Sequence, residues 1–373
     1  MSVKIKILHP LLCYYPSQAG GTANSIYWIN NSLDLKDFSS EIISTKLGLI
    51  EPISLKVFNN NHKAFFLNSR SFKYLYKNIK SLNRSKIIQF SSIFLSTNLI
   101  IILFALVKNK IVVVSPRGEL YHSAISQKYF LKFFWLSIIQ LFQKSINFHV
   151  TNNFEKELVQ KKFPNSKSIV VIPNYIEMPK KLSLSINMSF VFVGRINPIK
   201  NIHLLISAIS NIHKLYPNIK LNILGSARLD HELLYLNDLQ LQIKESDLEN
   251  VVFFKGHLQG DVKNEIIATS KALILPSKSE NFGNVVLEAL AQGTPVIASK
   301  NTPWKILNDY ESGLWVGSNI KELTSAMIKI LSLDKIEYNQ MRKNAFELCK
   351  SKYDIKKNIK VWENYYKKLI TYD

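Results

Sequence analysis

The chain has 373 residues, of which 47% are hydrophobic and 20% charged, with 12 glycines and 12 prolines. This composition excludes a disordered chain, a collagen and a low-complexity repeat, and the length favours two domains. Lysine and arginine outnumber aspartate and glutamate by 48 to 27, so the net charge of +21 favours a phosphate-bearing partner. Two cysteines, Cys13 and Cys349, are too few for a disulfide framework or a cysteine-rich zinc site, which favours a reduced, cytoplasmic setting.

The first half of the chain alternates between strand and helix patterns. The hydrophobic pattern predicts strands at 3–8, 87–90, 111–115, 149–151 and 168–172, and helices at 22–33, 95–107, 127–145 and 153–162. Residues 95–107 are apolar on nearly all sides, which predicts a buried helix. No apolar stretch reaches the ~20 residues needed to cross a bilayer, and we expect no signal peptide.

Residues 177–185 are rich in proline, lysine and serine and predict a linker, after which the alternation restarts. The second half has predicted strands at 190–193, 220–224, 251–254, 272–275 and 294–298, and predicted helices at 202–216, 262–269 and 284–292. Such alternation, made twice, predicts an α/β protein with two Rossmann-like domains whose parallel sheets face each other across a cleft. Ligands are then expected in that cleft, at the carboxyl ends of the strands. We expect domains at 1–178 and 179–350, and a C-terminal helix at 351–373 that packs back on the first domain.

A pair of glutamates flanks a turn in the second half. Glu280 follows the predicted strand 272–275, and Glu288 lies about one turn into the next helix. The backbone amides of Gly283, Asn284 and Val285 begin that helix, and such amides bind anions and sugar oxygens. The alternative to a binding role is that Glu280 only caps the helix and that Glu288 is a solvated helix residue. The apolar neighbours of Glu288 favour a hydrogen-bonding role for it.

Cations and glycines follow two other predicted strands. Strand 190–193 runs into Gly194, with Arg195 and Lys200 beyond it. Cations at the carboxyl end of a strand suit a diphosphate, although two surface cations in a basic protein are the alternative. Gly20 and Gly21 follow the first strand and allow close approach to a ligand, or form a plain turn. The absence of a GxGxxG motif disfavours a nicotinamide dehydrogenase.

Together with other motifs in the same order, these features resemble the retaining glycosyltransferases of family 4, which have the GT-B fold. The other motifs are Ser115-Pro116-Arg117-Gly118, Ile172-Pro173-Asn174 and Gly293-Thr294-Pro295-Val296-Ile297-Ala298. Many family members have His-Gly where this chain has Arg117-Gly118, which is similar to bacterial surface-polysaccharide relatives. The histidine role is therefore not carried over. Tyr175 replaces the usual glycine after Asn174, so we expect a different turn there.

The resemblance implies roles for named residues. Arg195 and Lys200 would bind the donor diphosphate and stabilise the leaving group, and Glu288 would bind the ribose. Glu280, counted with these cations as catalytic, would hold the donor sugar with the amides of Phe282, Gly283 and Asn284. Arg117 would contact the donor phosphate or an acidic acceptor. The remaining donor-binding positions that we expect are Gly20, Gly21, Gly194, His257, Leu258 and Val285.

The implied enzyme is a hexosyltransferase that uses no protein nucleophile. It would move a sugar from a nucleoside-diphosphate donor to a saccharide or lipid-linked saccharide acceptor, in the synthesis of lipopolysaccharide, O-antigen, capsule or exopolysaccharide. We expect no catalytic metal, because the chain has no Asp-x-Asp and no His or Cys pair at ligand spacing. We also expect no cofactor, since the nucleotide sugar is a substrate.

One basic stretch leaves two interpretations open. Lys73, Lys77, Lys80 and Arg84 recur at helical spacing beside an apolar face made by Phe72, Leu75, Tyr76, Ile79 and Leu82. This helix would either contact an anionic membrane at the cytoplasmic face or pack on the core with a solvated basic side. Two other functions stay as alternatives: a nucleic-acid-binding protein, disfavoured by the acidic pair and the lack of a binding motif, and another GT-B enzyme such as an epimerase.

Overall fold

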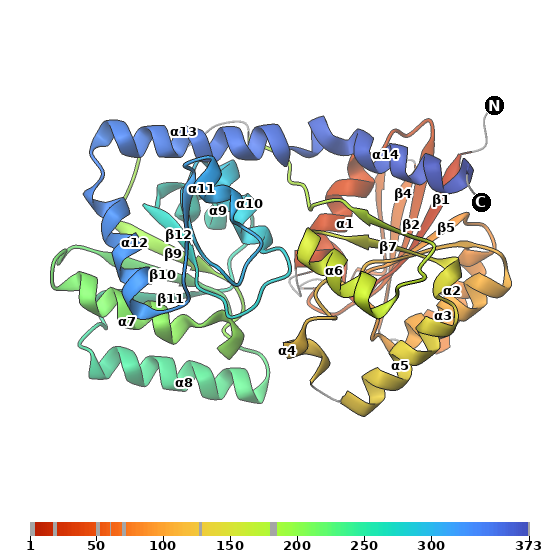
Figure 1. Ribbon diagram of the computed structural model, residues 1–373, viewed down its shortest axis with the longest axis horizontal. Helices are drawn as coiled ribbons and strands as arrows, with labels where there is room; N and C mark the ends of the chain where they lie inside the picture. Colours follow the sequence, from red (N-terminus) through yellow and green to blue (C-terminus); the bar gives the residue numbers. More distant parts are fainter. Residues whose placement is uncertain are drawn as a thin grey trace. The chain divides into compact units, whose positions relative to one another are not determined.

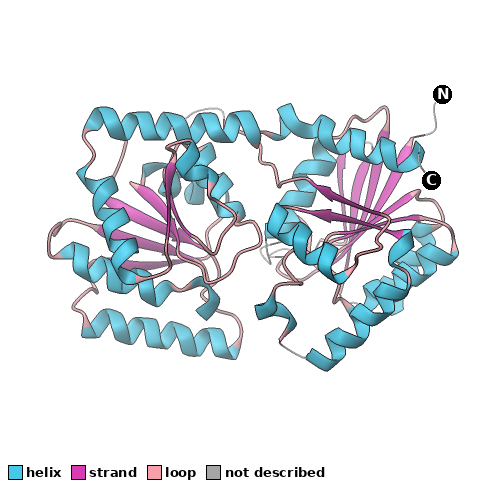
Figure 2. Cartoon of the chain, in the orientation of Figure 1, coloured by secondary structure: helices cyan, strands magenta, loops and turns pink. Residues whose placement is uncertain are grey.

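The chain divides into two compact units, each built around one sheet. The computed structural model describes residues 4–17, 21–49, 53–59, 61–68, 72–126, 129–179 and 185–371. Unit 1 comprises residues 1–177 and 355–373, and unit 2 comprises residues 178–354. In both units strands alternate with helices along the chain (Figure 2). The two units are described separately below.

Unit 1 contains an eight-stranded sheet in the order β3-β4-β2-β1-β5-β6-β7-β8. Its strands are β1 Ile5–Pro10, β2 Phe38–Thr45, β3 Leu55–Asn59, β4 His62–Leu67, β5 Ile87–Phe90, β6 Ile111–Val114, β7 Ile146–Val150 and β8 Ser168–Val171. Neighbouring strands are parallel except β3 and β4, which pair antiparallel at the edge. Only a short turn joins these two strands, and a parallel pair would need a long crossover.

Helices cover both faces of this sheet. They are α1 Gly21–Ser32, α2 Phe72–Leu82, α3 Ser96–Val107, α4 His122–Ile125, α5 Tyr129–Leu141, the 3-10 turn η1 Gln143–Ser145, α6 Asn153–Lys162 and α14 Ile355–Thr371. One core cluster joins α2, α3, α5 and α6 to one face, and a second joins α1 and α14 to the other (Figure 1). Val112 and Val113 lie in different clusters, because successive strand residues point to opposite faces.

Unit 2 contains a parallel six-stranded sheet in the order β11-β10-β9-β12-β13-β14. Its strands are β9 Ser189–Val193, β10 Lys220–Leu224, β11 Val252–Gly256, β12 Ala272–Leu275, β13 Val296–Ser299 and β14 Gly313–Val316. Its helices are η2 Pro198–Lys200, α7 Ile202–His213, α8 Asp230–Glu245, α9 Gly260–Thr269, α10 Asn284–Ala291, α11 Ile306–Asp309, α12 Ile320–Ser332 and α13 Lys335–Lys352. Both sheets therefore bear out the α/β, parallel-sheet prediction.

Two sequence predictions about helices of unit 1 are wrong in part. Helix α3 is not buried all round, since Ile100, Phe104 and Val107 are exposed. Helix α2 buries Tyr74, Asn78, Ser81 and Leu82, whereas Phe72 and Tyr76 of the predicted apolar face are exposed. Polar Asn78 and Ser81 are accepted inside because each donates a hydrogen bond, to Tyr74 O and to Glu41 Oε1. Among the described helices, none is long and apolar enough to span a membrane.

Candidate functional site

The predicted catalytic residues of unit 2 meet where the strand order of its sheet reverses. The chain runs from β9 through β10 to β11, then returns to β12 on the other side of β9. Doubly wound sheets bind ligands at the carboxyl ends of strands at such a point. Arg195 and Lys200 follow β9, Glu280 follows β12, and Lys200 Nζ forms an ion pair with Glu280 Oε2. Lys278 N donates to Ile199 O at 2.8 Å, which ties the two loops together.

Glycines let the loops after β9 and β10 approach closely. Gly194 N donates to Leu224 O at 2.9 Å. A Cβ on Gly225 would lie 1.8 Å from Gly194 O, so only glycine fits at that position. This contact holds the backbone just before Arg195, whose side chain is 66% exposed and reaches into solvent.

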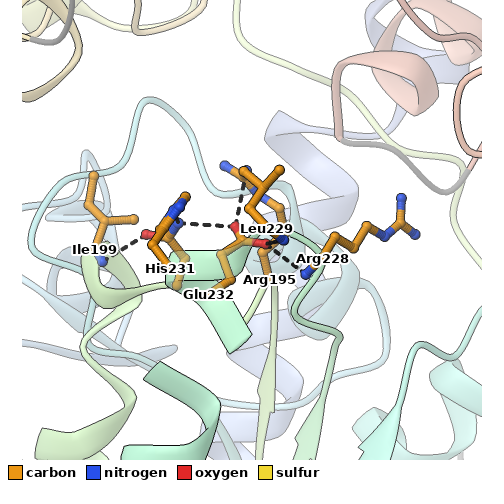
Figure 3. Close-up of polar contacts among 7 residues, drawn as sticks. Arg195, Ile199, Arg228, Leu229, His231 and Glu232 are labelled. Atoms are coloured by element: carbon orange, nitrogen blue, oxygen red, sulfur yellow. Dashed lines mark hydrogen bonds and ion pairs between the residues drawn. The ribbon is translucent and has the colours of Figure 1, made fainter. Parts of the chain in front are cut away.

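Glu232 is a site residue that the sequence predictions missed. Its buried carboxylate accepts hydrogen bonds from Asn197 Nδ2 at 3.0 Å and from the amides of Arg228 and Leu229, and lies 3.7 Å from Arg195 Nη1 (Figure 3). Burial would raise the pKa of Glu232, but these hydrogen bonds and Arg195 lower it below its ordinary value. Glu232 is thus an anion that steadies Arg195 and the loop after β9. Its position in the first turn of α8 could have indicated this role from the sequence, because a glutamate there often accepts hydrogen bonds from backbone amides.

Arg228 adds a further cation that the sequence predictions did not select. It follows β10, its side chain is exposed, and Figure 3 shows its guanidinium turned away from Glu232. Arg228 is also close enough to His257, which follows β11, to affect that histidine. Burial, Arg228 and Lys263 together lower the pKa of His257. The carboxyl edge of this sheet therefore carries Arg195, Lys200 and Arg228 after two neighbouring strands.

The turn between Glu280 and α10 has a defined shape. Gly283 has a φ of 78°, and a Cβ there would lie 3.0 Å from Leu275 Cδ2 and 3.2 Å from Glu280 Cγ. Phe282 is buried, and its carbonyl accepts a hydrogen bond from the indole of Trp304. The turn thus brings the start of α10, with the predicted Asn284 and Val285, next to Glu280.

Glu288 has one bound and one unsatisfied carboxylate oxygen. Its Oε1 lies 2.8 Å from Lys263 Nζ, and both side chains are 15% exposed. Its Oε2 is buried and has no hydrogen-bond partner in the part of the chain that the structure describes. A buried acceptor without a donor is costly, so this oxygen is suited to a hydroxyl from a ligand or to water. His257 and Leu258, expected to bind the donor, follow β11 at the same edge of the sheet, and His257 is exposed.

The predicted residues of unit 1 have different surroundings. Gly20 lies outside the described residues, and Gly21 is the first residue of α1. Arg117, with a φ of 55°, turns inward, and its Nη1 donates to Asn174 Oδ1 at 2.6 Å. Burial lowers the pKa of Arg117 to about 10, although Glu155 opposes this shift. Its Nε and Nη2 have no hydrogen-bond partner among the described residues, and they lie on the side of the guanidinium that suits a two-oxygen anion.

Unit 1 also buries three histidines in or beside its strands. The His9 ring forms a hydrogen bond with the Asn30 side chain. His62 Nε2 lies 2.7 Å from Tyr14 Oη, and His149 Nδ1 lies 2.9 Å from Ser115 Oγ. Desolvation lowers the pKa of His9 and His149 to about 3 and that of His62 to about 4. All three are therefore neutral at pH 7. Over the described part of the chain, no three His, Cys, Asp or Glu side chains are grouped closely enough to hold a metal ion.

Comparison with known structures identifies the fold. The chain is similar to sucrose-phosphate synthase from Thermosynechococcus elongatus, with a TM-score of 0.80, 18% identity and coverage of 99% of this chain and 100% of the other. It is also similar to HepE of Anabaena, solved with UDP and glucose, with a TM-score of 0.77, 18% identity and coverage of 96% and 99%. The predicted GT-B fold is thereby confirmed.

Comparison of sequences identifies the family of unit 2. Residues 178–348 match the family described as Glycosyl transferases group 1, so this segment is a glycosyltransferase group 1 domain. An uncharacterized glycosyltransferase of Methanocaldococcus jannaschii is 28% identical over 283 residues, which cover 64% of this chain and 65% of that protein. The matches with the first curated relatives span between 31% and 65% of those proteins' length.

Proposed function

We propose that the protein is a metal-independent, retaining glycosyltransferase that uses a nucleoside-diphosphate sugar. The observation that carries this proposal is the set of cations at the carboxyl ends of β9 and β10, beside the carboxylates of Glu280 and Glu288, in a group 1 domain. Cations suit a diphosphate, and carboxylates suit sugar and ribose hydroxyls.

The reaction breaks the bond between the anomeric carbon and the diphosphate oxygen. Negative charge develops on the departing diphosphate, and Arg195 and Lys200 stabilise it because they are already held in place by Glu232 and Glu280. The acceptor hydroxyl attacks from the face that the diphosphate leaves, and a diphosphate oxygen takes its proton. The anomeric configuration is retained, and the products are a nucleoside diphosphate and the extended saccharide.

The carboxylates and the turn before α10 orient the donor. Glu288 Oε2, which has no partner in the described part of the chain, accepts from a ribose hydroxyl. Glu280 leaves part of its contact with Lys200 to accept from the sugar, together with the amides at the start of α10. In unit 1, the Nε and Nη2 edge of Arg117 is the group available for a donor phosphate or for the acid of an acceptor.

The acceptor in this proposal is a lipid-linked saccharide of bacterial lipopolysaccharide, O-antigen, capsule or exopolysaccharide, reached at the cytoplasmic face of the membrane. Support comes from the Arg117-Gly118 motif and from the positive charge of the first half of the chain, where residues 1–178 contain 22 lysines and arginines against 8 acidic residues. The basic stripe of α2 contributes less than the sequence suggests. Lys77 Nζ lies 3.7 Å from the Phe65 ring centroid, and Arg84 pairs with Glu41 although its side chain is 53% exposed. Lys73 and Lys80 are exposed as well.

A thermal-shift series with UDP-, GDP-, ADP- and dTDP-sugars tests the donor assignment. One base should stabilise unit 2 clearly more than the others, by about 2.7 kcal/mol at 100 times its dissociation constant. EDTA should change neither this shift nor turnover. Arg195→Ala should abolish the thermal stabilisation that the diphosphate of the ligand provides. Lys220→Ala, at the opposite end of the same sheet, should retain this stabilisation. If no nucleotide sugar shifts the transition, the proposal is wrong.

A further inference from the structure

We propose that the outer face of helices α3 and α5 inserts into the interface of an anionic lipid bilayer. This face, called the outer apolar face below, consists of Ile100, Phe104 and Val107 of α3, Phe130, Leu131, Phe133, Phe134 and Leu141 of α5, and the adjoining Phe142. The inference deepens the proposed function in one respect, because it assigns the membrane contact to a defined surface.

Helix α5 exposes the kind of side chain that a helix in water normally buries. Phe130 is 87% exposed, Phe134 60% and Leu141 80%. Together with Phe133 they follow helical spacing along one side, while Leu136 and Ile139 on the opposite side are buried in the core of unit 1. Helix α5 is therefore apolar on both sides, and the side away from the core exposes its phenylalanine and leucine side chains to solvent, with Lys162 Nζ 5.8 Å from the Phe133 ring centroid.

The single charged residue of α5 does not relieve this exposure. Lys132 Nζ donates to Ala124 O and lies 5.1 Å from the Phe94 ring centroid, so its charge is used inside unit 1. Helix α3 contains no charged residue at all. Its Val107 is 79% exposed, and its buried side belongs to the same core cluster as α5. Exposed apolar side chains gathered on the outer sides of α3 and α5 are the kind of surface that marks an interaction site in proteins that fold in water.

Charge around the outer apolar face favours an anionic bilayer over another protein. Between residues 72 and 145 the chain has 11 lysines and arginines and one acidic residue, Glu119. Glu119 accepts from Ser92 Oγ and from the amides of Ile93 and Phe94, so its carboxylate is held within unit 1. Exposed Lys108 follows α3 and exposed Lys144 follows α5. In a dimer through this face, the lysines of one copy would lie close to the lysines of the other and repel them. Anionic lipid headgroups would instead neutralise these lysines.

Apolar insertion predicts a mode of binding different from purely electrostatic contact. Raising the salt from 0.01 M to 1 M shortens the Debye length from ~30 Å to ~3 Å and removes long-range attraction. Buried phenylalanine and leucine side chains are insensitive to this screening. At low lipid concentration, vesicles should therefore capture the protein only when they contain anionic lipid. Once the protein has bound, a fraction of it should stay on the vesicles when the salt concentration is raised.

Vesicle flotation with phosphatidylcholine, with and without phosphatidylglycerol, tests the inference on the full chain. The variant Phe130→Ser/Phe133→Ser/Phe134→Ser should bind mixed vesicles roughly a hundredfold more weakly than the wild type. The matched control Leu234→Ser/Leu241→Ser/Ile336→Ser changes three exposed apolar residues of unit 2 and should bind normally. Phe130→Trp should be quenched by lipids brominated on their acyl chains, and Leu234→Trp should not.

Three outcomes would overturn the inference: no binding of the wild type to mixed vesicles at low salt, equal binding by both triple variants, or vesicle-free self-association that the α5 variant abolishes. Nucleotide-sugar binding is measured separately by thermal shift without vesicles. The α5 variant should retain it in full, so failure of the membrane inference and failure of the proposed function give different results.

Discussion

The two sheets accommodate polar side chains in different ways, because charge pairs line the carboxyl edge of the sheet in unit 2, whereas unit 1 buries neutral histidines along its strands. In unit 2, charged residues at that edge are paired, as in Lys200 with Glu280 and Lys263 with Glu288. In unit 1, three histidines are buried uncharged, and Arg117 keeps two N–H groups without a partner in the described part of the chain. Two sheets of similar topology therefore carry sites of different chemistry.

The difference follows from desolvation. A charge that is partly exposed and paired keeps its ionised form with little penalty, so unit 2 presents ready-made charge to a ligand. A histidine sealed between a sheet and its helices has no such partner and stays neutral. We infer that unit 2 presents charged groups at its site, whereas unit 1 presents neutral hydrogen-bonding groups and the buried guanidinium of Arg117.

The largest expected effect is the sensitivity of unit 1 to acid. The folded pKa values of His9, His62 and His149 lie below the ordinary 6.5, so their contribution to stability is complete above that pH and declines as the pH falls towards 4. Between pH 7 and pH 5 each histidine should lower the free energy of unfolding by about 2 kcal/mol. Hydrogen exchange of peptides from β5 and β7, compared with β9 and β12, measures this.

The variant His62→Gln should remove about a third of that acid sensitivity, since glutamine does not titrate. His203 and His257 of unit 2 also have lowered pKa values, but neither is fully buried, so unit 2 should respond less. An equal loss of protection in both units on acidification would show that buried histidines do not distinguish them.

The next effect in size is the loss of a paired cation from unit 2. Arg195→Ala should reduce turnover by ~10²–10³, because the cation stabilises charge that appears only in the transition state. Lys200→Ala should lose a similar factor. The melting temperature of Arg195→Ala should stay near that of the wild type, since the side chain is 66% exposed and Glu232 keeps its hydrogen bonds to Asn197 and two amides. Lys220→Ala is the control, and near-normal turnover of Arg195→Ala would refute the diphosphate assignment.

The smallest effect separates the two carboxylates. Glu288→Gln should weaken the affinity for a free nucleoside diphosphate about tenfold, the worth of one hydrogen bond to a charged acceptor. Glu280→Gln should weaken it less, because Glu280 is assigned to the sugar, which this ligand lacks. Titration calorimetry on both variants measures the difference, with Glu265→Gln on the exposed side of α9 as the control. Equal losses, or a larger loss for Glu280→Gln, would reverse the assignment.

Much of the fold could be predicted because its signals are local. Helix α6 and strands β10 and β12 begin and end where the periodicity predicts, and most other predicted elements differ from it by a few residues at their ends. Residues 38–67 had no predicted element, although they form β2, β3 and β4. Their alternation is irregular, and pairing within the sheet stabilises them, since β2 pairs with β1, β4 with β2 and β3 with β4. Helix α8 has no predicted counterpart either, because exposed Leu233, Leu234 and Leu241 obscure the helical spacing of its buried apolar residues.

The amino-acid sequence places Arg195, Lys200 and Glu280 at the same edge of one sheet, because parallel strands all end at that edge and each motif directly follows a strand. The folded structure was needed to show which of these charges are paired, that Glu232 supports Arg195, and that Arg117 turns inward. It also decided which side of α5 remains uncovered. The reason is physical: strand and helix patterns depend on neighbours along the chain, whereas pairing and burial depend on residues that only folding brings together.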